Sequence, residues 1–193
     1  MLNLFRILLP LLFALTCQAQ ENLQDSIATE RTRLHKTHMG ILGVWAGANI
    51  IHGSISAANS QKSEHYFHQM NAYWNFANLA IAGLGFLQAK KQKGIHYTTA
   101  ENLIEQHKIE KILLLNTGLD LAYIMTGFYL REKGSDRSVG YGNSLLLQGG
   151  FLFIFDIIQY ANHRRNGKFL EKHLDKWQME GNLNGIGLTY RFP

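Results

Sequence analysis

The sequence predicts an all-α protein, a four-helix transmembrane bundle, and two observations lead to this prediction. Four largely apolar segments of about twenty residues, the length an α-helix needs to cross a bilayer, recur along the 193-residue chain. Each segment also carries one stripe of polar residues at helical spacing. Helices of this kind turn their polar stripes toward one another and their remaining surface toward lipid.

The chain divides into four parts. Residues 1–20 have Arg6 ahead of an apolar run, which is typical of a secretory signal peptide. Residues 21–38 are a polar, interfacial lead-in, and residues 39–165 hold the four-helix membrane bundle. Residues 166–193 form an amphipathic basic helix and a tail. The tail alternates like a β-strand, but without a predicted partner strand we expect it to be loose or docked.

Each helix has its own local signals. Residues 39–58 contain no formally charged side chain, and residues 66–88 end before three lysines and Gly94. Thr98 and Glu101 have the spacing of a capping box, so a helix begins near Thr98 and continues into the apolar segment 112–130. A turn follows at residues 134–136, and the last segment, 141–160, is closed by His163 and two arginines.

A faint internal repeat pairs the two halves of the bundle. The residues Gly47, Asn49 and His52 align with Gly118, Asp120 and Tyr123 at an offset of 71 residues. The chain can therefore be interpreted as two tandem helical hairpins, and chance similarity between apolar helices is an equally good explanation. Small transporters are also built from duplicated hairpins, so the repeat bears on function.

The polar stripes define a predicted polar layer inside the bundle. Its members are Asn49, His52, Asn75, Asn78, Asp120, Tyr123, Gln148 and Asp156. An ionised carboxylate at mid-bilayer costs roughly 2.5 to 3.5 kcal/mol, so Asp120 needs a partner or a proton, and we expect His52 to supply it. The layer is either hydrogen-bonding glue between helices or a cavity that handles a proton or a small ligand.

Several function classes find little support. The net charge of +5 comes without a nucleic-acid recognition element, and Cys17, the single cysteine, lies inside the predicted signal peptide. No nucleophile or nucleotide-binding motif occurs, so we expect no enzyme. A haem could be bound by histidines, namely His65, His68, His38 and His52. A third metal ligand is missing, so we predict no metal site and leave the cofactor unknown.

A GxxxG pattern formed by Gly43 and Gly47 allows a homo-oligomer.

One stretch carries a family resemblance. Residues 66–83, with the pattern FHQMNxxWN, preceded by Gly43, Trp45 and Asn49, resemble a family of small bacterial four-helix membrane proteins of unknown function. The resemblance covers residues 39–165 and implies a helical integral membrane protein. It implies no biochemical activity.

The sequence therefore predicts an uncharacterised protein of the bacterial envelope that lies in the lipid bilayer of the inner membrane and is structural or binds a small ligand. The alternatives are a small-solute or proton transporter, a haem-binding electron carrier and a soluble periplasmic bundle. Lysine and arginine concentrate on the side that holds residues 21–38, 88–111 and 164–193, which favours a cytoplasmic location for that side. A cleaved signal peptide favours the opposite, so orientation stays open.

Overall fold

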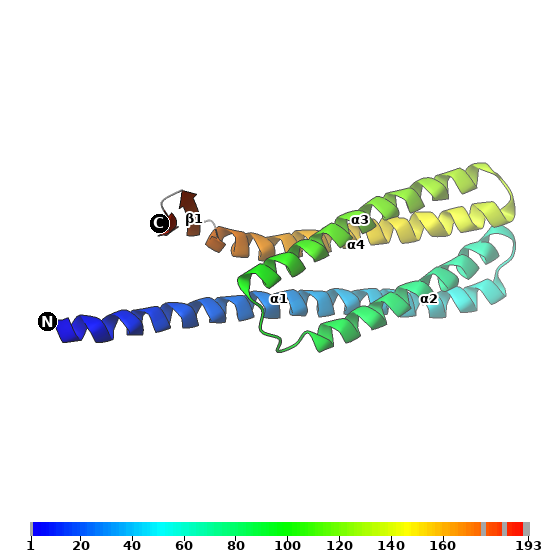
Figure 1. Ribbon diagram of the computed structural model, residues 1–193. Coiled ribbons are helices and arrows are strands. Elements are labelled where there is room, and N and C mark those ends of the chain that lie inside the picture. Colours follow the sequence, from blue (N-terminus) through cyan, green and yellow to red (C-terminus); the bar gives the residue numbers. More distant parts are fainter. Residues whose placement is uncertain (1, 175–176, 183–184, 191–193) are drawn as a thin grey trace.

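The computed structural model describes residues 2–174, 177–182 and 185–190, and describes side chains within residues 23–172. The fold is all-α with four long helices, as the sequence predicts (Figure 1). A short antiparallel strand pair follows the last helix. The elements are α1 (Leu2–Asn59), α2 (Lys62–Lys91), α3 (Thr99–Glu132), α4 (Asp136–Leu174), β1 (Trp177–Asn182) and β2 (Gly185–Tyr190).

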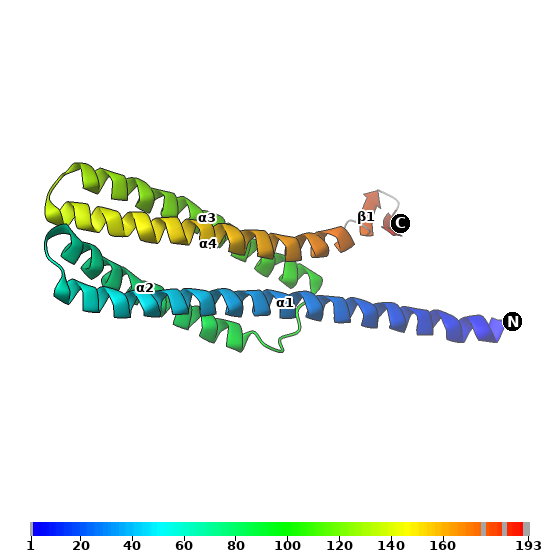
Figure 2. The same cartoon turned by 180° about the vertical axis from the view of Figure 1, so that it is seen from behind.

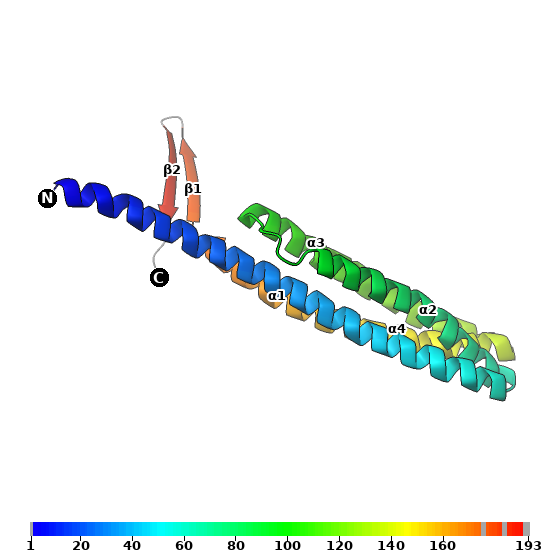
Figure 3. The same ribbon diagram turned by 90° about the horizontal axis from the view of Figure 1, so that it is seen from below.

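The helices are arranged as two hairpins. Helix α1 packs mainly against α2, and α3 packs mainly against α4. The hairpins meet mostly through α2 and α4, with smaller contacts of α1 with α4 and α3 (Figure 2). The turns of both hairpins lie at one end of the molecule, and the N-terminal part of α1 extends alone beyond the other end (Figure 3). This arrangement makes α1 and α3 run in the same direction.

Three of the helices are long and apolar enough to cross a membrane. They are Leu23–Asn59 within α1, Thr99–Glu132 and Asp136–Lys172 within α4. Helix α2 has 30 residues, so its length suffices, but its composition does not reach that level. The physical reason is its amide stripe, because Asn71, Asn75 and Asn78 lower its hydropathy while all three lie buried.

Residues 21–38, predicted as a polar lead-in, form part of the long helix α1. Helix α1 is continuous from Leu2 to Asn59, and residues 23–38 pack inside the molecule. Ile27 and Arg31 are each only 2% exposed there, and His38 is buried as well. Apolar periodicity does not reveal this packing, because the segment buries polar side chains, and an interfacial location of the segment stays a prediction. Cleavage of residues 1–20 stays a prediction.

The C-terminal region also differs from the prediction. No new helix begins after residue 166, because α4 continues without a break to Leu174. Trp177, expected at the end of an amphipathic helix, instead begins strand β1. Strand β1 pairs with β2 in antiparallel register, with Trp177 opposite Tyr190 and Asn182 opposite Gly185. The tail was expected to be unpaired because its partner strand had been assigned to a helix.

The capping box at the start of α3 is confirmed. The Thr98 hydroxyl accepts a hydrogen bond from the Glu101 backbone N–H at 3.3 Å, and the Thr98 backbone N–H donates to Glu101 Oε2 at 2.8 Å. These two bonds satisfy donors that the first turn of a helix leaves free. Together with Gly94, whose φ of +81° suits glycine, they fix the point where the chain turns from α2 into α3.

Two layers follow one another along the helices. Residues 41–59, 66–87, 112–130 and 139–158 form what we call the apolar band, and residues 23–38, 98–111 and 159–172 form the polar stem. Large apolar side chains cover the outside of the band, among them Val44 (76% exposed), Leu84 (70%) and Met125 (66%). The 37 residues of α1 that begin at Leu23 span about 55 Å, so the helices exceed the roughly 30 Å of a bilayer core.

Glycines permit the closest helix contacts in the band. A Cβ atom added to Gly127 would lie 2.8 Å from the Gly142 carbonyl oxygen, so α3 and α4 touch through their backbones there. A Cβ added to Gly140 would collide with the Ser63 carbonyl oxygen and with Tyr66, where α4 crosses α2. Such contacts are typical of membrane helices, where small residues at the interface replace the hydrophobic effect as the reason for close packing.

Candidate functional site

The apolar band contains only two formally charged residues, Asp120 on α3 and Asp156 on α4. Asp120 is 3% exposed and Asp156 is 6% exposed. The two carboxyl groups lie close enough to interact electrostatically across the α3–α4 interface. Burial and proximity together make this acidic pair the chemically most unusual feature of the band.

Only uncharged groups surround the acidic pair. Gln159 Nε2 donates to Asp156 Oδ1 at 2.9 Å, and the Asn116 side chain also hydrogen-bonds Asp156. Asp120 Oδ2 is buried and has no hydrogen-bond partner. Among residues 23–172, no ion pair joins either carboxyl group to a basic side chain. Within residues 23–172, the pair therefore has no basic counter-ion.

This arrangement has one direct chemical consequence. Two carboxylates that share a site repel each other, and burial in a medium of low dielectric constant makes the doubly ionised state costly. A proton shared between the two groups removes one charge and supplies a donor for an unpaired oxygen. The geometry is thus suited to holding a proton at the centre of the helix bundle.

A second group of polar residues, the amide cluster, joins three helices near the acidic pair. Asn71 Oδ1 on α2 accepts hydrogen bonds from Ser144 Oγ at 2.8 Å and from Gln148 Nε2 at 2.9 Å, both on α4. Gln148 Oε1 accepts from Trp45 Nε1 of α1 at 3.0 Å. Asn71, Ser144 and Gln148 are buried. Because donors and acceptors match across helices, this cluster fixes the relative register of α1, α2 and α4.

The other members of the predicted polar layer occupy varied positions. Asn75 and Asn78 are buried and form a chain along α2, in which Asn78 donates to Asn75 Oδ1 at 3.2 Å and Asn75 donates to the Asn71 backbone oxygen at 2.9 Å. Asn49 is half-buried and donates to the Trp45 backbone oxygen of its own helix at 2.9 Å. Tyr123 packs edge-on against Trp74 with ring centroids 4.7 Å apart.

The expected pairing of Asp120 with His52 is wrong. His52 is exposed on α1, and its ring lies 5.2 Å from the ring of His68. The charged group that lies close enough to interact with Asp120 is Asp156. The pairing was inferred from depth along the helices, but the sequence does not show which helices are neighbours. Helix α3 packs on α4 and has little contact with α1.

The histidines considered for a haem do not gather at one place. His65 Nδ1 lies 2.7 Å from the Ala57 backbone oxygen, whereas His68 contacts His52. His38 lies near His163 instead, with ring centroids 5.8 Å apart. In the part of the chain searched for metal sites, no group of three or more His, Cys, Asp or Glu side chains is placed to hold an ion.

The two glycines of the GxxxG pattern, Gly43 and Gly47, have different surroundings. A Cβ added to Gly43 would contact Ala82 of α2 at 3.8 Å, whereas Gly47 has open space around it. Gly43 therefore faces α2 within the same chain. An oligomer formed through Gly43 and Gly47 stays a prediction.

Sequence reasoning missed the polar interior of the stem. Arg31 Nη1 donates to Asn102 Oδ1 at 2.7 Å, and Asn102 Nδ2 donates to Gln24 Oε1 at 2.8 Å. Gln106 Nε2 donates to Glu110 Oε1 at 3.0 Å, and Arg164 Nη1 lies 2.6 Å from Glu171 Oε1. The signal was present, because Thr98, Asn102, Gln106 and Glu110 follow one another at a spacing of four residues, one face of a helix.

Fold and site thus define a class, a four-helix bundle with three candidate membrane spans and a buried acidic pair. The sequence profile of a family of unknown function, DUF6992, matches residues 41–157, which include both Asp120 and Asp156. The chain belongs to this family. The match agrees with the resemblance to an uncharacterised family noted in the sequence. No curated protein and no solved structure matches the chain.

Proposed function

We propose that this is an integral membrane protein whose four helices cross a bacterial inner membrane and whose acidic pair, Asp120 and Asp156, binds a proton within the bilayer. The observation that carries the proposal is the proximity of the only two charged residues of the apolar band, both buried and without a counter-ion among the side chains that the structure describes. Ionisable residues inside membrane segments are rare and mark functional sites by default.

Membrane insertion is supported by the surface of the band. Its large exposed side chains are apolar on all four helices, including Ile51 of α1, Phe76 of α2, Leu115 of α3 and Ile154 of α4. A soluble protein rarely exposes so large a continuous apolar surface, because it would aggregate. Helix α2 crosses with the others, since it packs along α1 and connects the far end of α1 to the near end of α3.

Carbonate extraction of membranes tests insertion. We expect the full-length chain to stay in the membrane pellet, because releasing it would expose the apolar band to water. Release into the wash would contradict the proposal and would favour a soluble periplasmic bundle.

Infrared spectroscopy of the reconstituted protein tests the proton. A protonated carboxyl group absorbs at a carbonyl frequency distinct from that of a carboxylate, so wild-type protein should show a buried protonated-acid band at neutral pH. This infrared absorption should disappear in the double variant Asp120→Asn, Asp156→Asn. It should persist in Glu132→Gln, which changes an exposed carboxyl group of α3, the helix of Asp120. If wild-type protein lacks this infrared absorption, the acidic pair does not hold a proton and the proposed proton site is wrong.

Transport is the second candidate, favoured by the arrangement of the helices as two hairpins. In proteoliposomes, pH-driven flux that Asp120→Asn abolishes would make the acidic pair part of a transport pathway. Protein that shows the infrared band and no flux would instead have a static proton site.

A further inference from the structure

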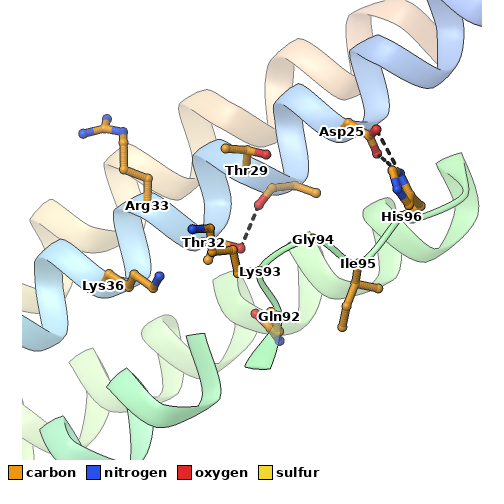
Figure 4. A pocket seen from close by; sticks show the side chains of 11 residues that line it. Asp25, Thr29, Thr32, Arg33, Lys36, Gln92, Lys93, Gly94, Ile95 and His96 are labelled. Atoms are coloured by element: carbon orange, nitrogen blue, oxygen red, sulfur yellow. Dashed lines mark hydrogen bonds and ion pairs between the residues drawn. The ribbon is translucent and has the colours of Figure 1, made fainter. Parts of the chain in front are cut away.

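A groove lies where the loop between α2 and α3 folds back against α1. Its volume is about 290 Å³, and its lining includes Thr29, Thr32, Lys36, Lys93, Ile95 and His96 (Figure 4). Residues 92–96 of the loop form one wall, and about three turns of α1 form the other. The groove is part of neither the acidic pair nor the amide cluster.

We call the end of the groove at Lys36, nearer the apolar band, its upper end, and the end at Asp25 its lower end. The position of the groove along α1 places the upper end at the membrane surface. Ile41, the first exposed apolar residue of α1 in the band, is five residues beyond Lys36, which corresponds to about 7.5 Å along a helix. The headgroup layer of a bilayer is roughly 5 to 8 Å thick on each side of the hydrocarbon core. Lys36 therefore lies at the depth of lipid headgroups, and the lower end of the groove lies in water.

The upper part of the groove carries unbalanced positive charge. Lys36 and Lys93 come from opposite walls, and neither forms an ion pair among residues 23–172. Arg33, also in the lining, is paired with Glu30 at 2.6 Å. The acidic lining residue, Asp25, lies at the lower end, where its carboxylate is held by His96 at 2.9 Å. An anion at the upper end would thus meet two free ammonium groups.

Apolar side chains continue from the groove toward the band. Ile95 lines the groove and is 48% exposed, and Phe86 and Leu87 are exposed on the last turns of α2 above it. A ligand with a negatively charged headgroup and an acyl chain would fit both the positively charged groove and the apolar side chains beyond it. Free inorganic phosphate would use only the charged part.

We propose that this groove binds the phosphate headgroup of an anionic phospholipid, held between the ammonium groups of Lys36 and Lys93, with its acyl chains against the exposed apolar side chains of α2. The lysines act as point charges for the phosphate, as juxtamembrane basic residues do at anionic membrane surfaces. This inference rests on the membrane insertion proposed above and is independent of the acidic pair.

Thermal unfolding in nanodiscs tests the inference. Wild-type protein should unfold roughly 5 °C higher in discs of phosphatidylcholine mixed with phosphatidylglycerol than in phosphatidylcholine alone, because a bound lipid stabilises the folded state. The double variant Lys36→Gln, Lys93→Gln should lose most of this difference. The matched control Lys168→Gln, Lys172→Gln removes two exposed lysines from the stem portion of α4 and should keep it.

The outcomes separate the proposals. If both double variants lose the same part of the difference in unfolding temperature, the stabilisation by anionic lipid depends on the total charge of the protein. That result would overturn the groove as a binding site. Inorganic phosphate added to phosphatidylcholine discs should give no comparable stabilisation, and a full effect of phosphate would assign the groove to a free anion instead. Failure of the wild-type chain to enter nanodiscs would sink membrane insertion and this inference together, whereas normal entry without a lipid effect would sink only the inference.

Discussion

The apolar band and the polar stem both bury polar side chains, but they neutralise charge in different ways. In the stem, the buried Arg31 donates to the side-chain and backbone oxygens of Asn102 and lies over the Tyr97 ring, and Arg164 joins Glu171 and Glu110 in an ion-pair network. In the band, amides bond to amides, and the only two charged residues face each other. The stem reaches water, which stabilises ions at its rim. If the band lies in lipid, as we propose, it has no such solvent, and charge there is restricted to groups that can take up a proton.

The largest effect is expected at the buried guanidinium of the stem. Asn102→Leu removes the side-chain acceptor of Arg31 and leaves a charge that is 2% exposed. We expect a loss of about 3 to 5 kcal/mol in unfolding free energy, measured by denaturant unfolding in detergent. The double variant Arg31→Met, Asn102→Leu should recover much of this loss, because it removes the charge with its partner. A single variant as stable as wild type would show that the stem does not need the contact.

A smaller loss is expected from the amide cluster of the band. Gln148→Leu removes one hydrogen bond to Asn71 and one from Trp45. We expect a destabilisation of about 1 to 3 kcal/mol, because the half-buried Trp45 indole N–H loses its acceptor and the buried Asn71 keeps only the hydrogen bond from Ser144. Gln88→Leu, which makes the same replacement at an exposed position of α2, should have little effect in the same unfolding assay. Equal effects at both positions would remove the difference between buried and exposed amides.

A still smaller loss of stability is expected from the amide stripe of α2. Asn75→Leu together with Asn78→Leu removes a chain of bonds that runs mostly along one helix. Both bonds join residues of α2, and a hydrogen bond contributes about 0.5 to 1.5 kcal/mol net, so we expect the double variant to lose roughly 1 kcal/mol and to assemble less completely. Unchanged thermal stability in detergent would contradict the role of the stripe as glue.

The smallest effect is expected at the surface of the stem. Glu30 and Arg33 form an ion pair at 2.6 Å, but the Arg33 side chain is 63% exposed. Glu30→Ala should change the unfolding free energy by about 0.5 kcal/mol or less, because water and salt screen exposed pairs. A loss comparable with that of Asn102→Leu would show that exposed and buried charges of the stem contribute alike.

The sequence was sufficient to predict the helices of the band, because apolar length and a polar stripe are local properties. It also placed Asn78 and Asp120 on inward faces, where both are buried. It did not identify the partner of Asp120, since neighbour relations between helices depend on how hairpins dock. The packed stem was missed for a different reason. Its core combines Ile27, Leu170 and polar residues such as Gln106, so hydropathy alone does not separate it from a solvated segment.

Three contacts between the first hairpin and the chain from residue 96 onward span similar intervals. Asp25 binds His96 and Arg31 binds Asn102, in each case 71 residues later, and Asn71 binds Ser144 73 residues later. If two identical hairpins associated about a two-fold axis, residues on that axis would meet their own copies. Arginine would then face arginine, and aspartate would face aspartate. Joining two unlike hairpins in one polypeptide allows each central position to meet a complementary neighbour, which a symmetric pair of identical subunits does not permit.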